Sequence, residues 1–335
     1  MLLKKAIIIV VSILCGLALF SNVLAHTPLK PDEENHSIAT AFEISNPTKS
    51  WTLYRELHEE GEADYYKLQL EPGERLVLSI YASKAEDPNF APYLAVIGAD
   101  IPQNDSVPDF IEVPEGAGVT VIQSLRPDKP EYEPFTPSSY FYLIDFEKEI
   151  QNSETYYLAI YQTTSSGRYG MAVGFKEEFT ILEWLKIPLD VIEIHQWELQ
   201  PLYLILAPLI ITLLAGFILF FWRYKNKLTF FGILGTVAGF FYLGSGFMIL
   251  MQTIIALNGS ANNSLAFVTA IFVLIPFLLG FVLLRKIIRI ELEISKRDRF
   301  VLVIICVLGL FFWSGLFLGP LLTVLAAVYP YNKVY

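Results

Sequence analysis

Cysteine is nearly absent from this chain of 335 residues, which contains only Cys15 and Cys306. Both cysteines lie within apolar runs, so the long polar stretch between those runs contains none. That polar stretch cannot form a disulfide, and its stability has to come from a packed hydrophobic core.

Motifs of common enzyme classes are also missing. The sequence contains no G-x-S-x-G elbow, no phosphate-binding loop and no Cys-x-x-Cys pair, and it has only four histidines. The run HEEGE at His58 is similar to the zinc-protease motif H-E-x-x-H. Its fifth residue is Glu62, however, and Gly61 stands where a helix is required. We therefore interpret it as a turn and expect no enzyme of a known motif class.

Charged side chains are missing from four long apolar runs, residues 201–222, 228–257, 264–284 and 300–325. Crossing the hydrocarbon of a bilayer takes about 20 apolar residues. The runs therefore predict a transmembrane domain of four helices over residues 201–335, surrounded by the lipid bilayer. Transporters usually place charged groups inside the membrane, whereas these runs offer only Thr, Ser, Tyr and Gln252, so transport is a secondary hypothesis.

Basic residues predict the orientation of this domain. They cluster in the links after the first and third runs, residues 223–227 and 285–299, while the link NGSANN after the second run has no charge. By the positive-inside rule the basic links face the cytoplasm. This rule predicts a multi-pass cell-membrane protein whose N-terminal half and C-terminus both lie outside the cytoplasm.

The start of the chain agrees with export. Lys4 and Lys5 precede an apolar run, and the small residues Val23 and Ala25 occupy the positions that a signal peptidase reads. Residues 1–25 are predicted to be a cleaved signal peptide, with an uncleaved membrane anchor as the alternative.

The charge of the chain divides it in two. Residues 26–200 contain 12 Lys/Arg against 31 Asp/Glu, whereas residues 201–335 contain 10 against 3. This asymmetry marks a domain boundary near residue 200. The strong acidity of the first half disfavours nucleic acid as a partner, because phosphate binding requires basic side chains.

Residues 26–176 have the pattern of an all-β domain. Runs rich in β-branched and aromatic residues recur between turns of Gly, Pro, Asn and Asp. Several runs alternate as half-buried strands do, with Tyr66, Leu68 and Leu70 on one face and Tyr65 on the other. The fold class expected for the whole chain is therefore mixed. An exported, jelly-roll-like sandwich of about eight antiparallel strands precedes the helical membrane bundle. The runs are WTLYREL, DYYKLQL, RLVLSIYA, YLAVIGA, VTVIQS, YFYLIDFE, TYYLAIYQ and GMAVGF.

A family resemblance supports the sandwich. EENHSIATAFEI followed by GEADYYKLQLEPGERLVLSI resembles the opening of the bacterial pre-peptidase C-terminal domain, and YYLAIYQTTSSGRYGMAV resembles its closing hairpin. The resemblance implies a jelly-roll-like sandwich over residues 32–175, expanded by a Pro-rich insertion over residues 100–139. Some members of that family bind calcium near the first turn, and Glu33, Asn35 and Asp64 match their pattern. His36 and Glu62 depart from it, which disfavours calcium.

These departures raise a second metal hypothesis. His26, His36 and His58 belong, with Glu62 and Asp64, to the N-terminal segment or the first turn, and imidazole suits copper or zinc better than calcium. A cleaved chain would begin at His26, whose free amine and ring could chelate copper. The leading expectation is no specific metal, and calcium and copper or zinc are the alternatives.

Residues 177–200 are predicted to lie at the membrane surface. The segment is apolar on one side and carries Trp184 and Trp197, which favour the headgroup level. Pro188 is expected to divide it into two short interfacial helices. His195 would then lie near the bilayer surface as a satisfied interface residue rather than a ligand.

Glycines spaced four residues apart form two faces of small residues on the predicted membrane helices. One face contains Gly235 and Gly239, and the other contains Gly315 and Gly319. Such faces let helices approach closely. We expect them to pack the four helices together, and contact with a partner membrane protein is the alternative.

The whole pattern predicts a membrane-anchored, extracytoplasmic binding module, an accessory subunit of a cell-surface or membrane complex. One alternative is metal binding or delivery by the N-terminal end of the sandwich. Another is a transporter or an enzyme of unrecognised class.

Overall fold

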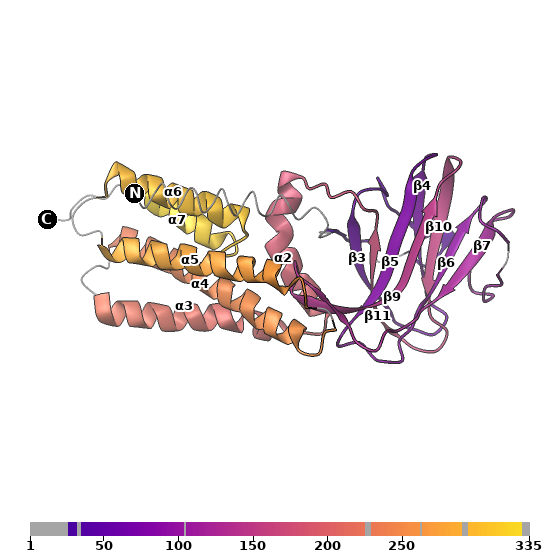
Figure 1. Cartoon of the computed structure of the whole chain (residues 1–335), viewed down its shortest axis with the longest axis horizontal. Coiled ribbons are helices and arrows are strands. Elements are labelled where there is room, and N and C mark those ends of the chain that lie inside the picture. The colour runs from indigo at the N-terminus through magenta and orange to yellow at the C-terminus, as the bar shows by residue number, and fades with distance from the viewer. Residues whose placement is uncertain are drawn as a thin grey trace.

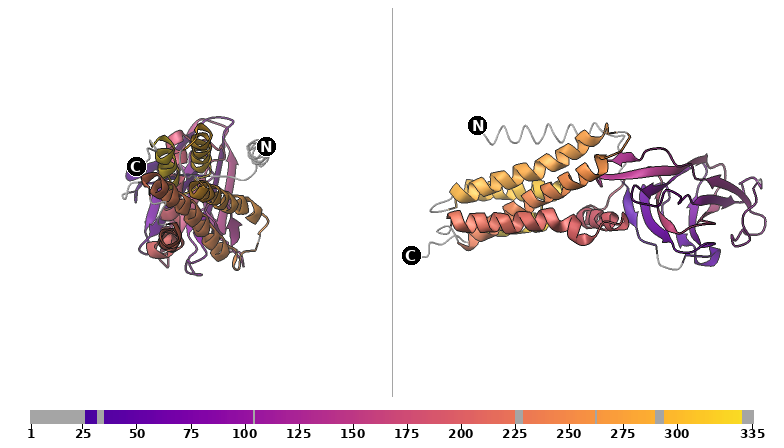
Figure 2. Two further views of the ribbon diagram at one scale, coloured as in Figure 1. Left: turned by 90° about the vertical axis from the view of Figure 1, so that its left-hand side faces the viewer. Right: turned by 90° about the horizontal axis from the view of Figure 1, so that it is seen from below.

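The computed structural model describes residues 26–31, 35–103, 105–224, 229–261, 263–289 and 294–329. A β-rich half lies at one end of an elongated bundle of helices (Figures 1 and 2). The predicted signal segment, residues 1–25, falls outside the described residues, so its cleavage stays a prediction.

Every β-rich run identified in the sequence forms a strand. These are β3 (Trp51–Leu57), β4 (Ala63–Leu70), β5 (Arg75–Ser83), β6 (Tyr93–Gly98), β7 (Gly118–Gln123), β9 (Ser138–Glu149), β10 (Glu154–Tyr161) and β11 (Gly167–Val173). The pattern missed three strands, β1 (Thr27–Leu29), β2 (Phe42–Glu43) and β8 (Glu131–Glu133). They are too short for an alternating pattern to be visible.

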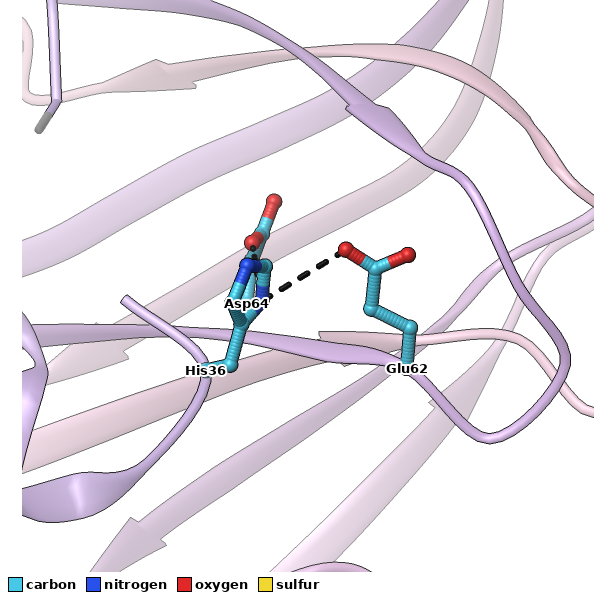
Figure 3. A group of neighbouring side chains, drawn as sticks. All are labelled: His36, Glu62 and Asp64. Carbon is cyan, nitrogen blue, oxygen red and sulfur yellow. Dashed lines mark ion pairs between the residues drawn. The ribbon is translucent and has the colours of Figure 1, made fainter. Parts of the chain in front are cut away.

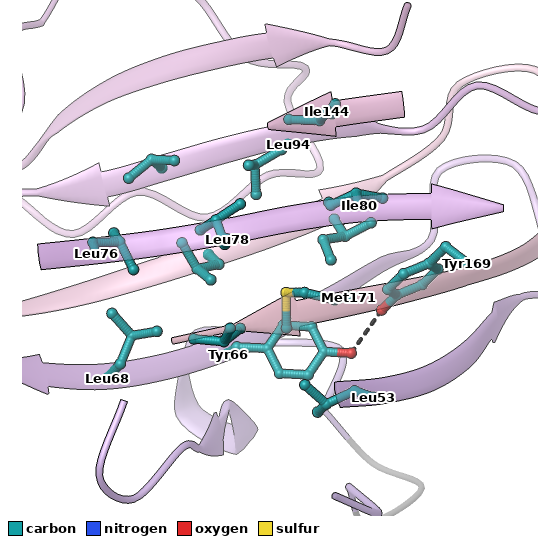
Figure 4. Close-up of a cluster of buried hydrophobic side chains, with 14 of the residues drawn as sticks. Leu53, Tyr66, Leu68, Leu76, Leu78, Ile80, Leu94, Ile144, Tyr169 and Met171 are labelled. Atoms are coloured by element: carbon teal, nitrogen blue, oxygen red, sulfur yellow. Dashed lines mark hydrogen bonds between the residues drawn. The ribbon is translucent and has the colours of Figure 1, made fainter. Parts of the chain in front are cut away.

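The strands form two sheets that face each other as a sandwich. The six-stranded sheet has the order β1-β3-β11-β5-β9-β8, and the five-stranded sheet has the order β2-β4-β10-β6-β7. Leu53 and Ile80 from the first sheet share a core with Leu68 and Leu94 from the second (Figure 4). Most strand pairs are antiparallel, as expected. The exceptions are the parallel pairs β1–β3 and β2–β4 at the edges, which involve two of the strands that the sequence pattern missed.

The outer face of the five-stranded sheet is covered by the first half of the Pro-rich insertion. Ile111 and Val113 pack with Tyr65 and Ile97 of the sheet. The backbone N–H of Glu112 donates to the Tyr65 hydroxyl at 2.8 Å. The insertion is therefore part of the folded domain, not a loose loop.

The outer face of the six-stranded sheet carries tyrosines that contact helix α2 (Ile181–Trp197). The ring of Trp197 lies 4.9 Å from that of Tyr54 and 6.3 Å from that of Tyr81. The Trp197 indole N–H also donates to the carbonyl of Arg55 at 3.2 Å. Helix α2 thus attaches this sheet to the helical half of the chain.

Helix α2 is one continuous helix lying crosswise to the bundle (Figure 1). The prediction that Pro188 divides it is wrong. Proline lacks an N–H and leaves the carbonyl four residues earlier without its helical partner. That carbonyl belongs to Trp184, and the indole N–H of Trp313 donates to it at 3.0 Å. A residue distant in sequence therefore supplies the missing hydrogen bond, which local pattern could not reveal.

Three helices are long and apolar enough to cross a bilayer, namely α3 (Leu202–Tyr224), α4 (Phe230–Leu257) and α5 (Ala266–Arg289). The predicted fourth run instead contributes to two shorter helices, α6 (Lys296–Phe311) and α7 (Leu318–Val328). Trp313, Gly315, Leu316 and Phe317 between them have positive φ. Left-handed backbone at these positions ends a right-handed helix, so the fourth continuous span is not formed.

Helix α6 begins at the end of the bundle away from the sandwich, and α7 returns the chain to that end (Figure 1). Arg299, in the first turn of α6, donates to two carbonyls at the end of α7. One belongs to Ala327 and the other to Tyr329, which directly follows the helix. The Tyr329 ring also lies 4.9 Å from that of Phe230 at the start of α4. The described part of the chain therefore ends near the start of α4 and the first turn of α6. Residues 330–335 lie outside the described residues, so the side of the membrane on which the C-terminus lies stays a prediction.

Both glycine faces are filled from within the chain. A side chain added at Gly235 would meet Ile287, and one at Gly239 would meet Leu284. Gly315 and Gly319 face the ring of Tyr242 in the same way. These glycines therefore pack helices of one chain together, and contact with a partner membrane protein stays a prediction.

The second half of the insertion docks the sandwich onto the bundle. The Tyr132 hydroxyl donates to Thr269 of α5 at 2.6 Å, and Thr269 donates to the carbonyl of Pro134 at 2.7 Å. The Ser139 hydroxyl donates to the carbonyl of Ala256 at 2.6 Å. Direct hydrogen bonds therefore hold the two halves in one orientation.

Candidate functional site

Three of the predicted site residues meet at the end of the sandwich formed by the β3–β4 turn (Figure 3). Nδ1 of His36 lies 3.5 Å from Oε1 of Glu62 and 3.4 Å from Oδ1 of Asp64. The other oxygen of Glu62 accepts the backbone N–H groups of His58 and Glu59, which shapes the turn. Gly61 completes the turn with a φ of +80°.

Asn35 belongs to the same end but has a structural role. Its side-chain N–H donates to the carbonyl of Tyr65 at 3.2 Å, and its carbonyl accepts the N–H of Tyr65 at 2.7 Å. Its side-chain oxygen accepts from Arg55 at 2.7 Å. Asn35 thus fixes the N-terminal segment against β4.

Asp64 is fully buried and fully paired. Arg55 donates to its two oxygens at 3.2 and 3.3 Å, and the Tyr169 hydroxyl donates to it at 2.5 Å. Tyr169 and Tyr66 share a further hydrogen bond of 2.7 Å between their hydroxyls (Figure 4). Burial, followed by the nearby Asp64 charge, raises the pKa of both tyrosines above its usual value. Both hydroxyls therefore stay protonated, and Tyr169 can donate to Asp64.

This geometry does not suit a calcium ion. Calcium takes about six to eight oxygen ligands, whereas the guanidinium of Arg55 already occupies the position of a cation beside Asp64. Moving Arg55 away would leave a buried positive charge without its partner, which is costly. Of the three grouped residues, His36 and Glu62 then remain as ligands for an ion. Glu33 lies outside the described residues.

The side chains of the other two predicted histidines are not part of this group. His26 precedes β1, and its Nδ1 lies 2.6 Å from the hydroxyl of Ser50, before the start of β3. Asp64, by contrast, contacts Arg55 near the other end of β3. This strand has seven residues and rises about 3.3 Å per residue, so most of its length separates His26 from Asp64. Burial lowers the pKa of His26 to about 4. His58 is exposed in the turn. The predicted ligand set therefore does not form one site.

A second polar group lies where α2 meets the bundle, and the sequence did not single it out as a site. Nδ1 of His195 lies 2.9 Å from Oε2 of Glu198. The same oxygen accepts from Gln200 at 3.3 Å, and Gln200 in turn accepts from Gln252 of α4 at 2.9 Å. This chain of four side chains, which we name the junction cluster, links α2 to the membrane helices. All but Gln200 are more than nine-tenths buried.

The junction cluster is incompletely paired. Within the part of the chain that the structure describes, Oε1 of Glu198 and Oε1 of Gln252 are buried without a hydrogen-bond partner. Buried polar atoms almost always have partners, so such exceptions call for an explanation. The available signal in the sequence was Gln252, the amide within an otherwise apolar predicted span.

The chain was compared with models of known protein families and with curated proteins. No family model matches it, and no curated protein is similar enough to count as a match. The resemblance to the pre-peptidase C-terminal domain therefore stays a prediction.

Proposed function

We propose that this chain is an extracytoplasmic binding module fixed on a membrane bundle, acting as an accessory subunit of a membrane complex. The docking contacts carry this proposal. Tyr132, Ser139 and Trp197 hydrogen-bond or pack across the boundary between the two halves. A module docked in this way presents its free surface at a constant height and angle, which suits recognition of a neighbour in the same membrane.

The free surface is at the ends of the strands. The outer face of one sheet is covered by the insertion, and that of the other contacts α2. Three of the four edge strands, β1, β2 and β8, have only two or three residues, too few to pair with a strand of another protein. The fourth, β7, has six residues, and the insertion covers part of its edge through a bridge between Gln103 and Val119 and a hydrogen bond from the Val121 N–H to Asp105. The exposed β3–β4 turn carries Glu59 and Glu60 at its tip. We propose that this acidic turn meets a basic surface on the partner.

Orientation in the membrane is part of the proposal. The last turns of α3 and α5 and the first turn of α6 lie at the end of the bundle away from the sandwich (Figure 1). These turns contain Arg223, Arg289 and Lys296. The positive-inside rule places that end in the cytoplasm and the sandwich outside. An amine reagent that cannot cross membranes should label Lys67 but not Lys296 in intact cells. Labelling of Lys296 alone would reverse the orientation.

Cross-linking tests the proposed partner surface. A zero-length reagent that joins carboxylates to amines should couple the chain to a specific membrane protein in native membranes. Replacing Glu59 and Glu60 by lysine should abolish this product, because like charges would then face each other. Glu71→Lys, at the opposite end of β4, is the matched control and should leave the product unchanged. Equal loss in both variants would refute the assignment to the β3–β4 turn.

Metal binding is the second candidate function. The observation in its favour is the contact of His36 with the carboxylates of Glu62 and Asp64, and the Arg55–Asp64 pair opposes it. Zinc or copper content of the purified full-length protein decides between the two. Metal bound in equal proportion to the chain and lost in His36→Ala would support this candidate. No difference between wild type and His36→Ala would reject it.

A further inference from the structure

A cavity of about 80 Å³ lies between the sandwich, α2 and the bundle. Its walls are mostly apolar and include Val191 of α2, Met248 and Ile249 of α4, and Phe272 of α5. The cavity is partly open. It lies where the crosswise helix α2 meets the sandwich-side ends of the membrane helices, the level of the bilayer surface if the bundle spans a membrane (Figure 1).

Two polar side chains that line this cavity keep an unused acceptor, Gln252, whose Oε1 is buried without a partner among the described residues, and His195. Ser245 and Thr269 also line the cavity, but each donates to a backbone carbonyl, at 2.9 and 2.7 Å. Nδ1 of His195 is engaged by Glu198, and its Nε2 has no hydrogen-bond partner among the described residues. The residue as a whole is 2% exposed and lines the cavity. In a neutral imidazole whose Nδ1–H donates to a carboxylate, Nε2 is an acceptor.

The surroundings of His195 select the kind of ligand. An acceptor calls for a donor, and a hydroxyl donates one hydrogen bond. None of the described residues that line the cavity is lysine or arginine, and the carboxylate of Glu198 lies directly behind the imidazole. An anionic phosphate or carboxylate headgroup would therefore be repelled and would lack a counter-charge.

We propose that this cavity binds the hydroxyl end of a neutral, single-chain lipid alcohol taken from the bilayer. The hydroxyl donates to Nε2 of His195, and the first carbons of the chain contact Val191 and Ile249. An apolar cavity of about 150 Å³ can bind benzene. The smaller volume here accommodates only the first few carbons, and the rest of the chain extends through the opening. This site is separate from the proposed partner surface on the β3–β4 turn.

Photolabelling of the full-length chain in phosphatidylcholine vesicles tests the proposal, with 1-decanol carrying a diazirine on its second carbon as the probe. Label is expected in the peptides containing Val191 and Ile249, and excess 1-decanol should remove it. The matching diazirine decanoic acid should label these peptides at least tenfold less. Equal labelling by the acid would overturn the choice of an alcohol.

Variants locate the site. Val191→Phe fills the cavity from α2 and should abolish the label, whereas Leu189→Phe, on the exposed side of the same helix, should leave it unchanged. His195→Phe keeps a ring but removes Nε2, and should reduce labelling about tenfold, the effect of one lost hydrogen bond. If Val191→Phe does not fold, as judged by its thermal unfolding, Ile249→Phe fills the cavity from α4. Label retained in a folded cavity-filling variant would refute the site.

Discussion

Two regions of this molecule bury polar side chains in opposite ways. At the β3–β4 end of the sandwich, Asp64 is held by Arg55 and Tyr169, and Asn35 uses both ends of its amide. In the junction cluster, oxygens of Glu198 and Gln252 have no partner among the described residues. Both regions are buried, and only the first is fully paired.

The comparison shows that residue type alone does not identify a site. The sandwich end has the histidine and carboxylates that suggest a metal, yet Asp64 and Asn35 there are already hydrogen-bonded to neighbouring residues of the fold. The junction cluster has fewer such residues but retains unused acceptors beside a cavity. Buried networks are rigid when fully satisfied, whereas an unpaired group in low dielectric is costly and is open to a ligand.

The largest effect is expected from breaking the paired region. Asp64→Ala leaves Arg55 partly buried without its counter-charge, which should lower the free energy of unfolding by about 3–5 kcal/mol. Denaturant unfolding of the full-length protein in detergent measures it. Glu60→Ala on the exposed turn is the control and should change the free energy by less than about 0.5 kcal/mol. Equal effects of the two substitutions would show that the network is not structural.

A smaller effect is expected from removing the side-chain hydrogen bond to the Trp184 carbonyl, which replaces the helical bond that Pro188 cannot donate. Trp313→Phe removes the donor to the Trp184 carbonyl and should cost about 1–3 kcal/mol. Pro188→Ala restores a helical N–H to that carbonyl, so the cost of Trp313→Phe should fall in the double variant. Thermal unfolding of all four proteins gives the coupling. Strictly additive effects would contradict the assigned role of Trp313.

An intermediate case between the two regions is His26, whose Nδ1 is hydrogen-bonded with the hydroxyl of Ser50. Burial lowers its pKa from 6.5 to about 4, so the folded state binds its proton more weakly than the unfolded state. The stabilisation is therefore present above pH 6.5 and is lost as the pH falls toward 4. His26→Gln should make stability less dependent on pH in this window, whereas exposed His58→Gln should not. An unchanged pH profile for His26→Gln would argue against a buried, neutral imidazole.

The smallest effect is expected in the junction cluster itself. Glu198→Gln keeps the shape of the side chain and removes a buried charge that is only partly paired. The lost attraction to His195 and the avoided desolvation offset each other, so the change should stay within about 1 kcal/mol. Asp64→Asn is the matched substitution in the paired region and should cost more. The comparison fails if Glu198→Gln is the more destabilising of the two.

Much of the fold could be read from local pattern. Alternation located the eight longer strands, and charge-free runs located α3, α4 and α5. The candidate site was predicted less completely than the fold. His36, Glu62 and Asp64 do meet, but Arg55 and Tyr169 already satisfy Asp64. Those partners lie nine and about a hundred residues away, and only folding brings them together.

The sequence by itself determined a cysteine-free acidic β domain followed by a basic apolar bundle, because composition and periodicity are local properties of the chain. Tertiary structure decided the rest. A turn of positive φ around Trp313 divided the last apolar run into α6 and α7 and presented the indole that keeps α2 continuous. It also decided which buried polar groups are satisfied. Pairing of buried groups depends on residues far apart in sequence, so no local pattern records it.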